Sequence, residues 1–231
     1  MIQINNLSKK YQSHIVLEIE KLHIPKGECF GLVGNNGAGK TTLFSLLLDL
    51  IQASTGEAKI ANIPVASSED WKSLTSSFLD ESFLISYLKP EEYFNFIGSL
   101  RGWNPQTVND FLQQFTELFN DEILGRNRYI RDLSKGNAKK VGIVGALIGY
   151  PELIILDEPF ANLDPSTQIR LKQILNTYKK EHKSTLLISS HDLQHTVEVC
   201  NRIVLLDKGK IVKDTPTTEN TLQELEQFFG G

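Results

Sequence analysis

The residues whose types and spacing can do chemistry fall in two stretches far apart in the chain. The first stretch has the G-x-x-x-x-G-K-[ST] spacing of a loop that surrounds a phosphate chain with backbone N–H groups, and it begins at Gly34. The second is an apolar run, residues 153–156, that ends in the adjacent carboxylates Asp157 and Glu158. The first can hold a triphosphate, and the second can hold its magnesium ion and polarise a water molecule. The sequence therefore predicts a protein that binds ATP and hydrolyses it.

Each position in the first stretch has a physical reason. Its glycines leave no side chain between the backbone N–H groups and the phosphates. The loop precedes an apolar helix, expected from Thr42 to Ile51, whose N-terminus favours anions. Lys40 is expected to reach the β- and γ-phosphates, and the Thr41 hydroxyl to bind Mg²⁺. The residues expected to contact the nucleotide are Gly34, Asn35, Asn36, Gly37, Ala38, Gly39, Lys40, Thr41 and Thr42.

The second stretch predicts a parallel strand that is buried on both faces, because residues 153–156 are all apolar. Ligands of open α/β sheets bind at the carboxyl ends of the strands, which is where the two acids fall. Successive strand side chains point in opposite directions, so the two carboxylates should have different tasks. We expect Asp157 to bind the magnesium ion and Glu158 to act as general base for the attacking water.

Composition places limits on the function. The chain has 231 residues, of which 40% are hydrophobic, and a net charge of −4, so a substantial core is expected and a nucleic-acid-binding surface is not. Cys29 and Cys200 form no C-x-x-C pair and are expected to be small buried hydrophobes in a reducing compartment. We expect no signal peptide and no membrane-spanning segment.

The order of the expected elements indicates an α/β fold with a helical insertion. Short strands dominate residues 1–65, helices dominate residues 82–149, and strands and helices alternate afterwards. Prolines open two of the expected helices, at Pro90 and Pro105. In the first of these, helical spacing predicts a core-facing stripe. The stripe consists of Tyr93, Phe96 or Ile97, and Leu100.

Four further features complete a resemblance to one family. Leu133-Ser134-Lys135-Gly136-Asn137 lies between the two nucleotide motifs and is similar to the signature usually written LSGGQ. Ala161-Asn162-Leu163-Asp164 looks like a D-loop, His191 follows a strand in the manner of a switch histidine, and Tyr11 stands where an aromatic ring stacks on adenine. The chain resembles the ATP-binding cassette (ABC) ATPases over essentially its whole length.

The resemblance implies a P-loop NTPase of ABC type, with a mixed sheet around the phosphate loop, an N-terminal antiparallel β subdomain and an inserted helical subdomain. One domain, 1–231, is expected, with residues 1–81 and 150–231 as the nucleotide-binding core and 82–149 as the helical part. It also implies catalytic roles for Lys40, Glu158 and His191, with ATP and Mg²⁺ as cofactors. Members pair head to tail, so Ser134, Lys135, Gly136 and Asn137 are expected to contact ATP bound by a partner. Ser134 and Asp164 can serve as helix N-caps at the same time.

This sequence departs from the family pattern at two places. Lys135 and Asn137 replace the usual Gly and Gln of the signature. The family's Q-loop glutamine has no counterpart in the segment around residues 77–82. We place Asp80 at that position, as a third magnesium-binding residue beside Thr41 and Asp157, with Glu81 as the alternative one residue later.

The resemblance therefore implies the ATPase subunit of a transporter, lying at the cytoplasmic face of the cell membrane and driving a separate integral membrane permease. The second ATPase subunit can be identical or different. The alternatives are a soluble ABC-type ATPase that serves translation, repair or cofactor assembly, and a P-loop kinase or GTPase, against which the signature and His191 argue. Phe83, Ile85 and Tyr87 lie before Pro90 without helical spacing, and we expect them to form an exposed patch that contacts the membrane partner.

Overall fold

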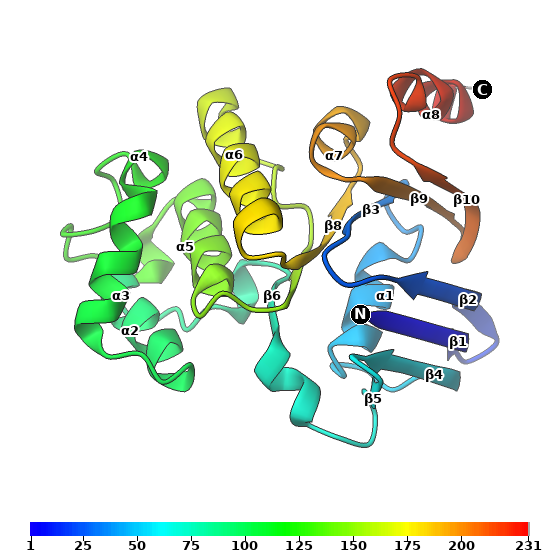
Figure 1. Cartoon of the computed structure of the whole chain (residues 1–231), viewed down its shortest axis with the longest axis horizontal. Coiled ribbons are helices and arrows are strands. Elements are labelled where there is room, and N and C mark those ends of the chain that lie inside the picture. The colour runs from blue at the N-terminus through cyan, green and yellow to red at the C-terminus, as the bar shows by residue number, and fades with distance from the viewer. Residues whose placement is uncertain (231) are drawn as a thin grey trace.

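Two sheets with helices packed between and beside them form the chain in the computed structural model, which describes residues 1–230 (Figure 1). The larger sheet has six strands in the order β10-β9-β3-β8-β7-β6, and all are parallel except β10. Its strands are β3 (Cys29–Val33), β6 (Thr75–Phe78), β7 (Leu153–Leu156), β8 (Thr185–Ser190), β9 (Arg202–Asp207) and β10 (Lys210–Pro216). The expected mixed sheet is confirmed.

The smaller sheet is antiparallel and has the order β2-β1-β4-β5. Its strands are β1 (Ile2–Tyr11), β2 (His14–Ile24), β4 (Thr55–Ile60) and β5 (Ile63–Pro64). Apolar residues alternate along β1 and β2, with Ile2, Ile4, Leu17 and Ile19 buried, so that one face of this sheet covers the core. This sheet is the expected N-terminal antiparallel subdomain.

Helices occupy the chain between β6 and β7, and they lie at one end of the molecule, away from the antiparallel sheet (Figure 1). They are α2 (Pro90–Leu100), α3 (Pro105–Leu112), α4 (Thr116–Phe119) and α5 (Lys135–Leu147), with short 3-10 turns at Glu81–Phe83, Gln113–Phe115 and Ile130–Asp132. The remaining helices are α1 (Lys40–Leu47), α6 (Pro165–Glu181), α7 (Leu193–Val199) and α8 (Thr221–Gly230), and a further 3-10 turn spans Asp70–Leu74. No helix within residues 1–230 is both long and apolar enough to cross a membrane.

The central sheet separates two hydrophobic cores, because its strands are apolar on both faces. In β7, Leu153 and Ile155 face the core that contains α1 and the antiparallel sheet. Ile154 and Leu156 face the second core, which contains the helical segment, α6 and α7. Cys29 and Cys200 are buried as expected and their sulfur atoms lie 3.3 Å apart.

Two helical expectations need correction. The helix after the phosphate loop runs from Lys40 to Leu47, shorter than Thr42 to Ile51, because Asp49 takes a left-handed φ of 54°. The predicted core stripe of α2 is also wrong in part: Tyr93 is buried and Ile97 packs partly buried against the core, but Phe96 and Leu100 are 43% and 68% exposed. The buried face of α2 is set instead by neighbours such as α5, whose Gly145 leaves room for the Tyr93 ring.

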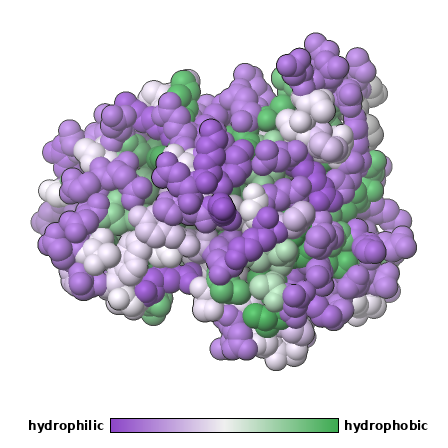
Figure 2. Space-filling model, in the orientation of Figure 1, coloured by the Kyte–Doolittle hydropathy of each residue, from purple (hydrophilic) through white to green (hydrophobic). Residues whose placement is uncertain are grey.

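Hydrophilic side chains predominate on the face shown in Figure 2, and apolar side chains gather there in smaller patches. Hydrogen bonds connect the helical segment to the larger sheet at one place. The Arg101 guanidinium, at the C-terminus of α2, donates to the Ser73 and Thr75 carbonyls and to the Ser76 hydroxyl at 2.5, 2.6 and 2.8 Å. These bonds fix α2 against β6, whose end leads into the site described below.

Gly142 gives a test of this packing. Alanine has a helix propensity about 1 kcal/mol better than glycine, which alone would stabilise α5. A Cβ atom at position 142 would however lie 2.1 Å from the Phe78 ring, and overpacking of a core costs about 1–3 kcal/mol. We expect Gly142→Ala to lower the free energy of unfolding by about 1 kcal/mol, measured by urea denaturation, with exposed Gln173→Ala in α6 as the control. A stabilised Gly142→Ala variant would contradict the packing.

Candidate active site

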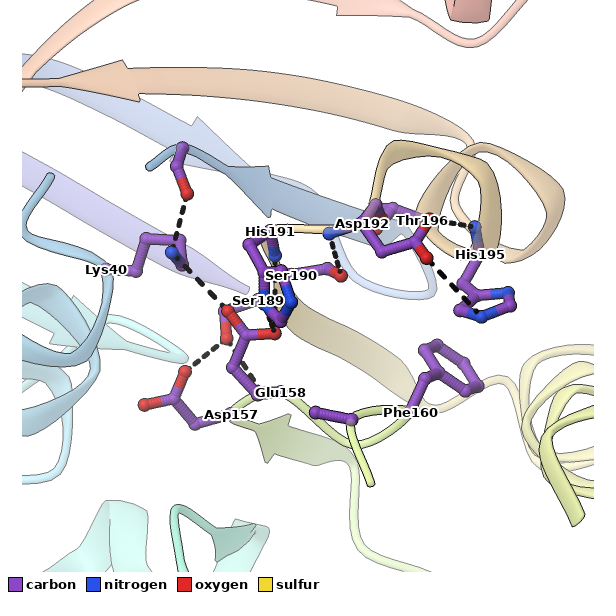
Figure 3. A network of polar contacts seen from close by, with 12 residues as sticks. Lys40, Asp157, Glu158, Phe160, Ser189, Ser190, His191, Asp192, His195 and Thr196 are labelled. Carbon is purple, nitrogen blue, oxygen red and sulfur yellow. Dashed lines mark hydrogen bonds and ion pairs between the residues drawn. The ribbon is translucent and has the colours of Figure 1, made fainter. Parts of the chain in front are cut away.

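Three adjacent parallel strands bring the expected chemistry together. In the sheet β8 lies between β3 and β7, so the carboxyl ends of all three meet at one edge. The phosphate loop follows β3, Asp157 and Glu158 follow β7, and His191 follows β8. Figure 3 shows Lys40, Asp157, Glu158, Ser189 and His191 converging there.

The phosphate loop is held open by backbone geometry that only glycine meets. Gly39 caps α1 with a φ of 109°, and a Cβ atom on Gly34 would lie 2.3 Å from the Leu206 carbonyl oxygen. Lys40 begins α1, its side chain is only 7% exposed, and its ammonium donates to the Gly34 carbonyl at 2.7 Å. The cationic group therefore lies inside the loop rather than in solvent.

Asp157 is buried against two hydroxyl groups. Thr41 Oγ1 donates to Asp157 Oδ2 at 2.6 Å, and Ser189 Oγ donates to Oδ1. Burial raises the pKa of Asp157, and the two hydroxyl donors oppose that shift. The Thr41 hydroxyl and the Asp157 carboxylate thus form a pair of hard oxygen donors beside the phosphate loop, which is the donor chemistry that suits Mg²⁺.

Glu158 has different partners from Asp157, as expected for a separate task. Its carboxylate lies between two groups, with Oε1 3.4 Å from the Lys40 ammonium and Oε2 2.8 Å from His191 Nδ1 (Figure 3). Its backbone has a φ of 48°, a left-handed conformation that a residue with a side chain keeps only when its surroundings enforce it. The Glu158 N–H donates to Ser189 Oγ at 2.9 Å.

The signature residues lie on a different element. Ser134 caps α5, and its Oγ accepts the Asn137 N–H at 3.2 Å, so the expected cap is present. Lys135 is exposed, and the Asn137 side-chain amide donates to Glu122 at 3.0 Å. Gly136 packs near the Asn162 carbonyl. In the part of the chain with described side chains, no hydrogen bond joins Ser134 or Asn137 to the phosphate loop.

Asp164 and Tyr11 both have local partners in this chain. The Asp164 carboxylate caps α6, accepting the Thr167 N–H at 3.0 Å and the Ser166 and Thr167 hydroxyls at 2.6 Å each. These bonds hold the pKa of Asp164 well below its usual range. Tyr11 ends β1 half exposed, with the Lys9 ammonium 4.8 Å from its ring centre.

Asp80, which the sequence led us to expect at the magnesium site, caps a local turn in this structure. Its carboxylate accepts the Ser82 N–H at 2.6 Å and caps the short turn at Glu81–Phe83. Glu81, the alternative, lies close to the catalytic residues. Burial lowers the pKa of the nearby Lys139 ammonium, and among the carboxylates the charge of Glu81 opposes this lowering most.

Two site residues escaped the sequence reasoning. Ser189 links Asp157 to the Glu158 backbone, and its only signal was a polar residue at the end of an apolar strand. Lys139 is buried in α5 although lysine is rarely buried, and nothing in its spacing distinguishes it from a solvent-exposed helical lysine.

The phosphate loop, the buried strand that ends in two carboxylates and the sheet order around them define a P-loop nucleotide-binding protein. The sequence profile of a family described as "ABC transporter" matches residues 17–161. The chain therefore belongs to the ABC transporter family, as one of its ATP-binding proteins.

Individual proteins similar to this chain are also described as ATP-binding proteins or cassettes. The Bacillus subtilis protein named "Uncharacterized ABC transporter ATP-binding protein YhaQ" is 31% identical over 230 residues, which cover 100% of this chain and 74% of that protein. A structure titled "Structure of ATP binding subunit of ABC transporter" superposes with a TM-score of 0.85 at 26% identity and covers 100% of this chain and 93% of that one. A dimeric cassette, MJ0796, in a post-hydrolysis state bound to ADP and Pi, has the same fold, with a TM-score of 0.84 at 21% identity, covering 94% and 99%.

Proposed function

We propose that this ATP-binding protein hydrolyses ATP to ADP and phosphate through Glu158, and that the cycle drives a separate integral membrane protein. The observation that carries the hydrolytic role is the position of the Glu158 carboxylate between Lys40 and His191. A carboxylate held against the phosphate-binding lysine by a histidine is within reach of a water that attacks the terminal phosphate.

The residues of this chain have separate tasks in that reaction. Backbone N–H groups of the loop 34–39 surround the phosphates, and the Lys40 ammonium exchanges the Glu158 carboxylate for the β- and γ-phosphate oxygens. Glu158, released from Lys40, accepts a proton from the attacking water. His191 keeps the Glu158 carboxylate oriented, by the bond at 2.8 Å seen here.

The donors beside the phosphate loop fit a magnesium ion. Thr41 and Asp157 would hold it, with Glu81 at the remaining protein position. When bound, Mg²⁺ neutralises charge that develops on the phosphate oxygens. Asp157 keeps its hydrogen bond from Ser189, which orients the carboxylate for this task.

The second half of the site comes from another subunit in this proposal. Among the described side chains, no hydrogen bond joins Ser134 or Asn137 to the phosphate loop of their own chain. The signature residues 134–137 lie at the N-terminus of a 13-residue helix, where anions are favoured. A head-to-tail dimer places them on ATP bound at the partner's loop. The dimeric cassette with the same fold supports this arrangement. ATP then holds two subunits together, and hydrolysis lets them part.

An apolar groove supports a membrane partner. It has a volume of about 270 Å³ and is lined by residues of β6, Phe83 and Tyr93 among others. Beside it the side chains of Phe83, Ile85 and Tyr87 are 56%, 39% and 71% exposed, as the sequence led us to expect. Apolar surface of this kind captures an amphipathic helix. We propose that a cytoplasmic helix of an integral membrane protein docks here, which places the chain at the cytoplasmic face of the membrane.

Replacement of the proposed general base tests the chemistry. Glu158→Gln removes the proton acceptor but leaves the phosphate loop intact, so we expect turnover to fall by about 100-fold or more while ATP still binds and an ATP-bound dimer accumulates. Turnover is measured by phosphate release and the dimer by size exclusion. Lys40→Ala, which removes the phosphate partner, should instead weaken ATP binding. Near-normal hydrolysis by Glu158→Gln would rule out Glu158 as the base.

A magnesium titration distinguishes Glu81 from Asp80. We expect Glu81→Ala to raise the Mg²⁺ concentration needed for half-maximal ATPase activity by about tenfold, because a ligand or water-bridged partner is lost. Asp80→Ala should leave it within about twofold, and neither variant should change nucleotide binding without metal. The opposite ranking would restore Asp80 to the metal site.

Charge placed in the groove tests the membrane partner. Phe83→Asp/Tyr87→Asp should fold and bind ATP, because both side chains are more than half exposed, yet fail to co-purify with membranes. Val212→Asp, an exposed apolar position on β10, is the control and should retain membrane association. Full association of the double variant would place the partner elsewhere and favour a soluble role for the ATPase.

A further inference from the structure

Lys139 contacts the turn 158–162, here called the catalytic turn, and has no task in the mechanism proposed above. It belongs to α5, the helix that begins after the signature serine, and its side chain is only 5% exposed. Its ammonium donates to two backbone oxygens, those of Glu158 at 2.9 Å and Ala161 at 3.0 Å. Both acceptors lie in the turn between β7 and α6. The buried lysine thus binds the backbone of the segment that carries the proposed general base.

The catalytic turn contains backbone conformations that residues with side chains rarely adopt. Glu158 and Asn162, which flank it, both have left-handed backbones, with φ of 48° and 62°. Such conformations persist in residues with side chains only when neighbouring contacts enforce them. The Glu158 carbonyl also accepts the Ala161 N–H at 3.3 Å, so the Lys139 bonds close a small network around the turn. The orientation of the Glu158 carboxylate toward Lys40 depends on this backbone.

The same turn touches α5 a second time. A Cβ atom on Gly136 would lie 3.3 Å from the Asn162 carbonyl oxygen, so the N-terminal end of α5 packs directly on it. Gly136 belongs to the signature, which in our proposal contacts ATP held by the partner. Lys139 and Gly136 therefore connect α5 with both ends of the catalytic turn, within one chain.

Lysine suits this position for reasons of charge and reach. An ammonium group has three donors, and two carbonyl oxygens here take two of them. The carboxylates of Glu81, Glu158 and Asp157 lie close enough for their charges to act on it. A buried cation among these acids offsets part of their mutual repulsion. A methionine would fill the same space with neither donor nor charge.

We infer that Lys139 is a positioning residue, which holds the Glu158 backbone in its catalytic conformation and transmits movement of the signature helix to it. The inference rests on the proposed hydrolytic function. Lys139 acts through the carbonyls of Glu158 and Ala161, to which its ammonium donates.

Three variants test the inference in the full chain. Lys139→Met should lower kcat by about 10- to 100-fold, because small displacements of a catalytic group are costly, and leave the ATP Kd within about twofold, since the phosphate loop is untouched. Lys139→Arg, which can donate to both carbonyls, should restore kcat to within about threefold of wild type. Lys179→Met is the matched control: the Lys179 ammonium also donates to a backbone oxygen, that of Val199 at 2.8 Å, away from the catalytic turn, and kcat should not change.

Amide hydrogen exchange supplies a readout that needs no turnover. Lys139→Met should accelerate exchange at residues 158–162 while the global unfolding transition stays in place, and Lys179→Met should not accelerate it. Wild-type kcat in Lys139→Met, or unchanged exchange at the turn, would overturn the inference. If Lys139→Met does not fold, the same two measurements are made on Lys139→Gln, which keeps an amide donor, and on Lys139→Ser. Wild-type kcat and wild-type exchange in both of these variants would overturn the inference. A wild-type chain without ATPase activity would contradict the proposed function instead. The exchange experiment would still show whether Lys139 holds the turn 158–162 in place.

Discussion

The parallel register of β3, β8 and β7 is the constraint on which the rest of the site depends. Val33 pairs with Ser190 and Leu156 with Ile188, so the three strands end within two residues of one another and present a lysine, a histidine and two acids to one volume. The strands are apolar on both faces, and the two cores hold that register from either side. A slip by one residue would turn Asp157 and Glu158 to each other's faces and separate Thr41 from its carboxylate partner.

Much of this arrangement could be predicted, because the decisive signals are local. The glycine spacing specifies backbone that only glycine adopts, and an apolar run followed by acids specifies a buried strand whose end carries ligands. The errors arose where distant contacts decide. Phe96 and Leu100 follow helical spacing yet face out, because α5 and Arg101 fix the rotation of α2. Asp80 and Glu81 are adjacent acids, and the sequence did not reveal that Asp80 caps the short turn that Glu81 begins.

Lys139 is a residue whose position the sequence could not predict. A lysine on a helix surface and a lysine that clamps a buried turn have the same sequence signal. Its task depends on where the chain from β7 to α6 passes, which in turn depends on the left-handed conformations at Glu158 and Asn162. The signature helix and the catalytic acid are therefore parts of one packed unit in this chain rather than neighbouring motifs.

The pairing of Glu158 with Lys40 places an anion of this chain beside the lysine of the phosphate loop. Any phosphate that enters the loop must first displace a carboxylate that is already covalently attached and close at hand, so the measured affinity is the intrinsic one reduced by that competition. A single phosphate group gains little from the exchange, whereas a triphosphate gains further contacts along the loop. The carboxylate therefore weakens the binding of an anion that contacts Lys40 alone more than that of a ligand with several contacts along the loop.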